Sequence, residues 1–173
     1  GHHNRVEDAY RIYLNVILSD PNYYHAWKGI AWIAFSHDRN TSTAKKILRW
    51  LKTNHPVPDY DLLLAEIASF ENDLPAKNNY ITAFTNEVSK PAYGDMYNKY
   101  LFALLTDEQQ NFTAAMRIAE TEVNNRPTPQ SYDLLAWAIF KNGNTAEAAQ
   151  IAKAQVIKRT FEPTALFHTG VVL

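Results

Sequence analysis

The sequence predicts an all-α fold, an α-α superhelix (solenoid) of about four stacked antiparallel helix pairs with half-repeats at both ends. The stretch from Pro129 to Pro163 holds two helical runs around a tight turn, and its prolines are 163 − 129 = 34 residues apart. The hexapeptide at 135–140, Leu-Ala-Trp-Ala-Ile-Phe, also matches Ile-Ala-Trp-Ile-Ala-Phe at 30–35. The offset between the two, 137 − 32 = 105, is three steps of about 35 residues. Repeats of this length are typical of stacked helical hairpins.

Helical periodicity, interrupted by prolines and polar turns, gives the elements in order. The expected helices span residues 6–18, 24–35, 44–51, 59–70, 75–88, 93–105 and 112–123, two more within 129–162, and a last one from 163 to 172. These helices form one domain with repeats at 4–21 (half), 22–56, 57–90, 91–128, 129–162 and 163–173 (half).

Composition indicates a folded domain and disfavours several function classes. The 173 residues are 46% hydrophobic and 13% aromatic, which is ample material for a core. The formal net charge is −1, so no bulk positive field attracts nucleic acid. Cysteine is absent, which removes disulfides, thiolate metal sites and cysteine nucleophiles. No apolar run approaches the roughly 20 residues that span a bilayer.

The N-terminus predicts a piece of a longer protein. The chain begins Gly1-His2-His3, without methionine and without a basic or apolar leader segment. We therefore expect that the native N-terminus is missing and that any signal peptide was lost with it. The three residues fit either a tag remnant or a native turn, and the compartment is left open.

The best copy carries a family resemblance on its first helix, its turn and the start of its second helix. The residues concerned are Tyr132, Leu135, Ala136, Ile139, Gly143, Asn144, Glu147, Ala148 and Ala152. This pattern resembles the tetratricopeptide repeat, and weaker copies extend over nearly the whole chain. The match is loose from 91 to 125, where the turn at 107–111 holds an extra residue or two. Small residues at Ala136, Ala148 and Ala152 let paired helices approach closely.

The resemblance implies that the first helices line an inner groove. Trp32 and Trp137 occupy matching places, and the pattern leaves open whether they face the groove or pack between repeats. The lysines and asparagines with which some family members hold a C-terminal carboxylate are missing from these positions, which disfavours a chaperone-tail clamp. The expected groove residues are His25, Lys28, Trp32, Phe35, Asp61, Gln130, Asp133, Trp137, Lys141, Thr164, Phe167 and Val171.

No residue pattern indicates catalysis, a cofactor or a metal. The six histidines form no His-x-x-x-His pair, and phosphate-loop and nucleophile-elbow motifs are absent. Asp59, Asp61 and Glu66 are better explained by capping and solvation than by acid-base chemistry, because Asp59 starts a helix. His168 is interpreted as a packing or groove histidine.

A basic stripe runs along the helix around 44–51, with two readings. We favour a solvated outer face, because charges elsewhere offset the stripe, and the alternative is docking of an acidic partner. Its residues are Lys45, Lys46, Arg49 and Lys52, with Arg39 and His55 near its ends.

The favoured function is a non-catalytic scaffold that binds a peptide or protein segment in the groove, with no nucleic acid and no membrane span. Trp32, Trp137 and Phe167 are the expected apolar anchors, and Lys28 and Asp133 the polar ones. The alternative is a regulatory or assembly arm of a larger enzyme or exported protein, making mainly intramolecular contacts. Because both end helices expose an apolar face, we also expect a longer solenoid or end-to-end self-association.

Overall fold

The computed structural model describes residues 2–173, with side-chain environments from Arg5 onward, and its regular structure in this range is helical without a strand. The all-α prediction is therefore confirmed. The chain divides into two compact units, Gly1–Pro91 and Ala92–Leu173. No helix within the described residues is long and apolar enough to cross a membrane.

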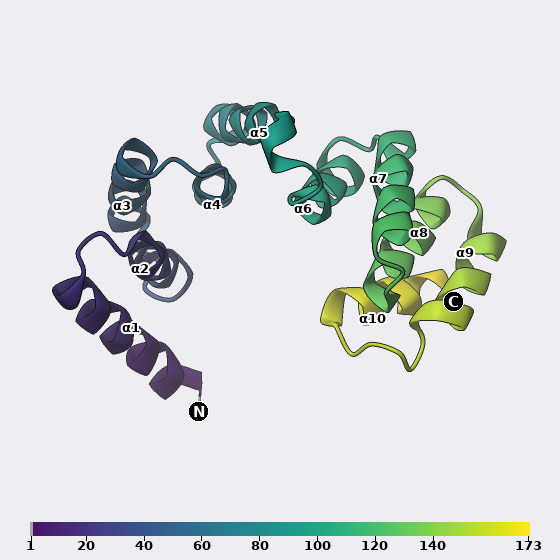
Figure 1. Ribbon diagram of the computed structural model, residues 1–173, viewed down its shortest axis with the longest axis horizontal. Helices are drawn as coiled ribbons and strands as arrows, with labels where there is room; N and C mark the ends of the chain where they lie inside the picture. The colour runs from purple at the N-terminus through teal and green to yellow at the C-terminus, as the bar shows by residue number, and fades with distance from the viewer. Residues whose placement is uncertain (1) are drawn as a thin grey trace. The chain divides into compact units, whose positions relative to one another are not determined.

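The first unit is a series of helices in which each packs against the next, and α2 also contacts α4 (Figure 1). Leu48 and Leu51 from α3 and Leu64 and Ile67 from α4 are almost completely buried in its core. The helices are α1 (His2–Ser19), α2 (Tyr24–Ser36), α3 (Thr41–Asn54), α4 (Asp59–Phe70) and α5 (Leu74–Val88).

The second unit packs around α8, which contacts α7, α9 and α10. As expected for a close helix crossing, Ala136, Ala148 and Ala152 are buried where α8 meets the following helical segments. Its elements are α6 (Asn98–Ala103), the π-helical turn η2 (Leu104–Glu108), α7 (Phe112–Asn125), α8 (Pro129–Lys141), α9 (Thr145–Ile151), the π-helical turn η3 (Ala152–Val156) and α10 (Pro163–Val172).

The helix expected over 93–105 differs from the observed structure. The 3-10 turn η1 (Pro91–Tyr93) and a bend at Gly94, whose φ is 49°, precede α6, which begins at Asn98. Proline lacks a backbone N–H and glycine adopts positive φ without steric cost, so this stretch turns rather than extending the helix. The π-helical turn η2 follows α6 directly and overlaps the start of the stretch 107–111.

One turn geometry recurs four times and gives the fold its repeat character. A residue with positive φ precedes an Asn or Asp that caps the next helix, and the cap side chain accepts a hydrogen bond from the backbone N–H three residues later at 3.0 to 3.3 Å. The cap's own N–H donates to a carbonyl near the end of the preceding helix. The pairs are Arg39 and Asn40, Asn72 and Asp73, Gln110 and Asn111, and Gly143 and Asn144.

The α1–α2 contact depends on the absence of a side chain at Gly29. A Cβ at this position would overlap the ring of Tyr13, so glycine lets the tyrosine of α1 lie directly on α2. Ile17 packs with Ala26 and Ile30 at the C-terminal part of the same contact. This arrangement places the N-terminal half of α1 beside the second half of α2, where the candidate site lies.

Candidate functional site

The predicted groove residues of the first unit lie mostly on α2, and the structure separates accessible from packed ones. Helix α2 is buried on two sides, as its composition predicts, by Ala26, Ile30, Ala31, Ile33 and Ala34. On the remaining side Trp32 is 53% exposed and His25 is exposed, while Lys28 and Phe35 are half-buried. Trp32 is thus the large aromatic side chain of this set that remains available to a partner.

Lys28 connects α2 to the start of α4. Its Nζ lies 2.6 Å from Oδ2 of Asp59, and both side chains are about one-third exposed, at 33% and 35%. Burial raises the pKa of the Tyr60 hydroxyl, and electrostatic repulsion from Asp59 and from Tyr24 raises it further. The lysine therefore ties two first helices together instead of pointing into open solvent.

Asp61 is not an accessible groove residue. Its carboxylate is buried and pairs with the Nζ of Lys52 on α3. This pair lies at a recess of about 450 Å³ whose other lining residues are Pro56, Val57, Pro58, Ala83 and Glu87. Asp61 therefore stabilises the α3–α4 contact at the wall of that recess.

The recess beside Trp32 has a mainly apolar lining. Its volume is about 250 Å³, and it lies between the N-terminal half of α1 and the second half of α2. Tyr13 and Trp32 supply aromatic rings to its wall, and Arg5 supplies its single formal charge. We call it the Trp32 recess; its lining residues are Arg5, Val6, Ala9, Tyr13, Trp32 and Ile33.

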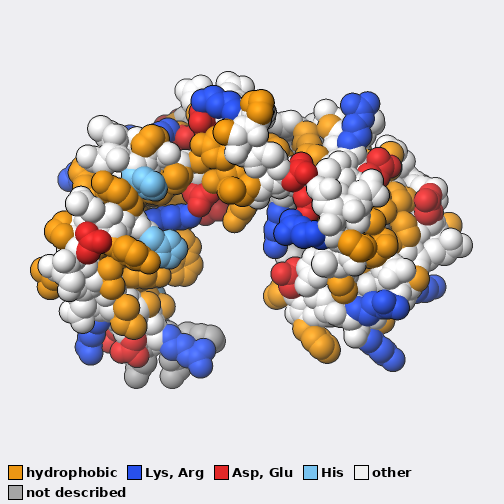
Figure 2. Space-filling view, in the orientation of Figure 1, with side chains coloured by type: hydrophobic (Ala, Val, Ile, Leu, Met, Phe, Trp, Pro, Cys, Tyr) orange, Lys and Arg blue, Asp and Glu red, His pale blue; other side chains and the backbone are white. Residues whose placement is uncertain are grey.

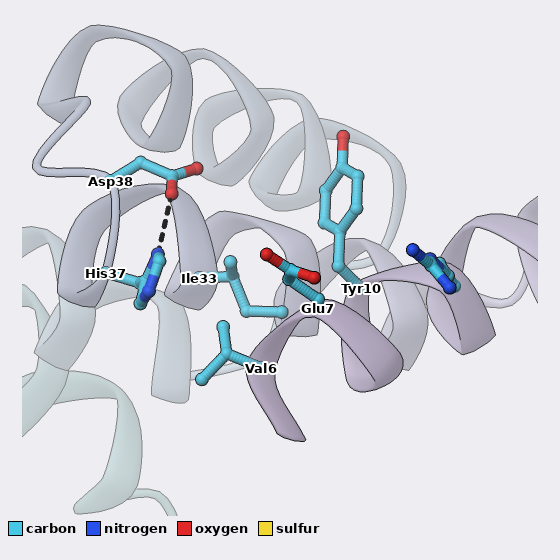
Figure 3. A pocket seen from close by; sticks show the side chains of 7 residues that line it. Val6, Glu7, Tyr10, Ile33, His37 and Asp38 are labelled. Atoms are coloured by element: carbon cyan, nitrogen blue, oxygen red, sulfur yellow. Dashed lines mark hydrogen bonds and ion pairs between the residues drawn. The ribbon is translucent and has the colours of Figure 1, made fainter. Parts of the chain in front are cut away.

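A second recess, of about 390 Å³, lies on the other side of the same helix contact. Val6 and Ile33 line both recesses, and Figure 3 shows these two side chains directed toward each other. Glu7 lies between Ile33 and Tyr10 in this view, and Nδ1 of His37 is 2.9 Å from Oδ1 of Asp38. With Arg11 also in the lining, charges of both signs surround this recess, unlike the Trp32 recess.

The surface of α1 changes character along the helix. Figure 2 shows charged side chains over its N-terminal part and apolar ones over its C-terminal part. The exposed apolar residues there are Ile12, Leu14 and Leu18. Of the α1 residues that line the Trp32 recess, Arg5, Val6 and Ala9 lie in the N-terminal half of the helix and Tyr13 lies in its C-terminal half.

In the second unit, Trp137 is packed rather than displayed. It is only 6% exposed, and the ring of His168 from α10 stacks on it with centroids 4.1 Å apart and planes 12° from parallel. Phe167 of α10 and Phe140 of α8 lie at 6.2 and 5.5 Å from the same ring. The nitrogen of Lys141 lies 4.8 Å from the indole centroid. This tryptophan is a core residue between α8 and α10.

Asp133 is also buried, and His168 is its partner. Oδ2 of Asp133 lies 2.9 Å from Nδ1 of His168, and the two side chains are 6% and 11% exposed. The remaining predicted groove residues of this unit are more accessible: Gln130 is exposed and donates to Oγ1 of Thr160 at 3.3 Å, and Phe167 is exposed. Thr164 and Val171 are also exposed.

The basic stripe of α3 is partly neutralised by neighbouring carboxylates. Nζ of Lys45 lies 2.7 Å from the carboxylate of Glu71, and Lys52 pairs with Asp61. Lys46 and Arg49 remain exposed. Two of the four stripe residues therefore join α3 to α4 and its C-terminal cap, and the other two remain in contact with solvent.

Sequence reasoning missed three parts of these sites. It did not pair Asp133 with His168, although their separation, 168 − 133 = 35, is one repeat and brings neighbouring first helices together. It also did not pair Lys28 of α2 with Asp59 at the start of α4, which lie 31 residues apart in the sequence. Arg5 and Tyr13 were missed because α1 was treated only as a terminal half-repeat. No family model matches this chain, and no curated protein matches it either.

Proposed function

We propose that this chain is a non-catalytic interaction module that binds a peptide or protein segment at the Trp32 recess. The observation that carries the proposal is a tryptophan that is 53% exposed beside Tyr13 and Arg5 at one recess. Trp, Tyr and Arg are the residue types most enriched in interface hot spots. Covering the exposed indole with a partner's apolar side chain would gain free energy in proportion to the area removed from water.

The size of the recess favours a protein segment over a free small molecule. Small-molecule pockets usually enclose about 300–1,000 Å³, whereas the Trp32 recess has about 250 Å³. A volume of this order fits one bulky side chain of a larger partner. Recognition of helices and extended peptides by helical surfaces uses a few such anchors.

The tetratricopeptide class and the superhelical stacking of the helix pairs belong to the same proposal. The recurring turn, the buried alanines at the helix crossings and the packing of successive helices within each unit support it. In arrays of this kind each hairpin depends on its neighbours for burial of its apolar face. The binding surface would then be carried by first helices such as α2.

A selected peptide tests this function directly. We would select binders from a displayed library of random peptides and measure their affinities by calorimetry for the native chain and for Trp32→Ala. Loss of an anchor at an interface centre typically costs about 2 kcal/mol or more, so affinity should fall at least about thirtyfold. Phe161→Ala is the matched control, since Phe161 is an exposed aromatic residue outside the recess.

Two outcomes would contradict the proposal. One is that selection yields no peptide that binds the folded chain. The other is that the selected peptides bind Trp32→Ala as tightly as the native chain, which would place the binding surface elsewhere.

The exposed apolar faces of α1 and α10 support a second proposal, self-association. Helix α10 contains no charged residue, and Leu166, Phe167 and Val171 are exposed on it. Sedimentation velocity over a range of concentrations should show a mass increase that is lost in Val171→Glu. A single monomeric species at all concentrations would contradict this proposal.

A further inference from the structure

The recesses at Asp61, at His37 and at Trp32 differ in the charges of their lining residues. The recess at Asp61 is lined by two carboxylates and one ammonium group, those of Asp61, Glu87 and Lys52. The recess at His37 has Glu7 and Asp38 against Arg11 and the imidazole. Among its six lining residues the Trp32 recess has one charged group, the guanidinium of Arg5, and no carboxylate. It is therefore the recess of the three whose lining carries a net positive charge.

We infer that the Trp32 recess selects a protein segment in which a bulky apolar side chain is adjacent to an aspartate or glutamate. The inference rests on the proposed function and names the chemistry of its partner. The apolar side chain would pack on Trp32 and Tyr13, and the neighbouring carboxylate would face Arg5. A guanidinium binds a carboxylate through two parallel hydrogen bonds, which gives direction as well as attraction.

The exposure of Arg5 determines how strongly the recess should prefer acidic over basic peptides. Arg5 is exposed, and exposed ion pairs are weak and screened by salt. The anchor side chain should therefore supply most of the affinity, and the acidic neighbour should supply selectivity and a faster association rate. We expect an acidic flank to bind about three- to tenfold more tightly than a basic one at low ionic strength, with a smaller ratio at high salt.

The test uses two synthetic peptides that differ only in charge. Both are acetylated and amidated and have a central leucine, flanked by glutamates in one and by lysines in the other. Binding is followed on the full chain through the indole N–H signals of its four ¹⁵N-labelled tryptophans. The Trp32 signal is assigned as the one missing from Trp32→Phe. The acidic peptide should move this signal at lower concentration than the basic peptide.

Charge reversal on α1 supplies the decisive variants. Arg5→Glu should reverse the order of the two peptides. Arg11→Glu should leave the order unchanged, because Arg11 is also exposed on α1 but lines the neighbouring recess. Circular dichroism of both variants checks that the helices are intact.

The inference is overturned if the order of the peptides survives Arg5→Glu or if Arg11→Glu changes it equally. It is also overturned if neither peptide moves the Trp32 signal up to about 1 mM. These failures are distinguishable from failure of the proposed function. If library-selected peptides need Trp32 but show no excess of acidic residues, the function stands and only the inference about charge falls.

Discussion

Trp32 and Trp137 occupy the same place in two matching hexapeptides, yet one is 53% exposed and the other 6%. Trp137 is covered by the following helix α10, whereas Trp32 lies at a recess lined by residues of the preceding helix α1. Helix α10 lays His168 on Trp137 with ring centroids 4.1 Å apart. At the same offset, 168 − 63 = 105, the first unit has Leu63, which packs in the α2–α4 core. Equal sequence patterns therefore produced one surface residue and one core residue.

The charged residues on α2 and α8 differ in the same way. Lys28 corresponds to Asp133, since 133 − 28 = 105, so the charge at this position changes sign. Lys28 forms a partly exposed ion pair with Asp59, whereas Asp133 forms a buried hydrogen bond with His168. The same position of a first helix is therefore accessible to solvent in one repeat and packed against the next helix in another.

The largest predicted effect separates the two tryptophans. Trp137→Ala should lower the free energy of unfolding of the second unit by about 3–5 kcal/mol, because it leaves a cavity between α8 and α10. Trp32→Ala should cost less than about 1 kcal/mol, as for most surface substitutions. Urea unfolding of both variants, followed by circular dichroism, measures the difference. Equal losses of stability would mean that Trp32 is also a core residue.

The two polar pairs should differ by a smaller amount. Asp133→Ala leaves His168 buried without a partner and should cost about 1–3 kcal/mol. Asp59→Ala breaks an ion pair whose side chains are one-third exposed and should cost about 0–1 kcal/mol. Thermal unfolding of each variant measures these costs.

A double variant checks the origin of the larger cost. Replacing both Asp133 and His168 by leucine removes the unpaired polar group and should recover part of the stability lost in Asp133→Ala. If the double variant is less stable than Asp133→Ala, the hydrogen bond is not the main source of the effect.

Replacing each of two helical glycines by alanine should change the free energy of unfolding in opposite directions. Gly29→Ala should destabilise the α1–α2 contact by about 1–2 kcal/mol, because overlap with Tyr13 outweighs the better helix propensity of alanine. Gly170→Ala on α10 meets no atom within 4 Å and should stabilise by up to about 1 kcal/mol. Hydrogen exchange of the α1 and α10 amides would locate each effect. A stabilising Gly29→Ala would show that Tyr13 has room to move.

The smallest predicted effect is a pH dependence confined to the first unit. Hydrogen bonds from Lys45 and then from Thr41 lower the pKa of Glu71. A lowered folded-state pKa adds stability above the ordinary glutamate pKa of about 4.3, and this stability is lost as the pH falls through the folded value. The contribution should be below about 1 kcal/mol, since the pair is partly exposed.

Lys45→Ala is the variant that tests this pH dependence. It should flatten the decline of stability with acid, as measured by urea unfolding between about pH 3 and pH 6. The helix caps Asn40 and Asn144 are 144 − 40 = 104 residues apart, and the same offset aligns Lys45 with Ala149. Alanine cannot form an ion pair, so the second unit has no counterpart of the Lys45–Glu71 pair at this position. An unchanged acid profile in Lys45→Ala would assign the decline to other carboxylates.

Local signals predicted the helices well because they depend on residues close in sequence. Periodicity and prolines predicted α2, α4 and α5 nearly at their observed limits. The start of α6 was missed because Pro91 and Gly94 act on the backbone of a turn, which apolar spacing does not report. The shared turn was recognised only at Gly143, although Arg39, Asn72 and Gln110 adopt positive φ at the same place.

The candidate site was less predictable, because exposure depends on the neighbour of each helix. The pattern marked Trp32 and Trp137 equally, and only the position of α10 decides that Trp137 is covered. Asp61 and Asp133 were marked as groove residues because their helix positions fit, but partners on adjacent helices bury them. Arg5 and Tyr13 belong to a recess formed by two helices, which one helix pattern cannot predict.

Measuring the solvent accessibility of Trp32 relative to Trp137 tests most directly whether the first tryptophan is a surface residue and the second a core residue. The two indole N–H signals can be assigned with Trp32→Phe and Trp137→Phe and then followed while a soluble paramagnetic agent is added. The Trp32 signal should broaden at low agent concentration, and the Trp137 signal should persist under α10. Equal broadening of the two signals, or earlier loss of Trp137, would contradict the account.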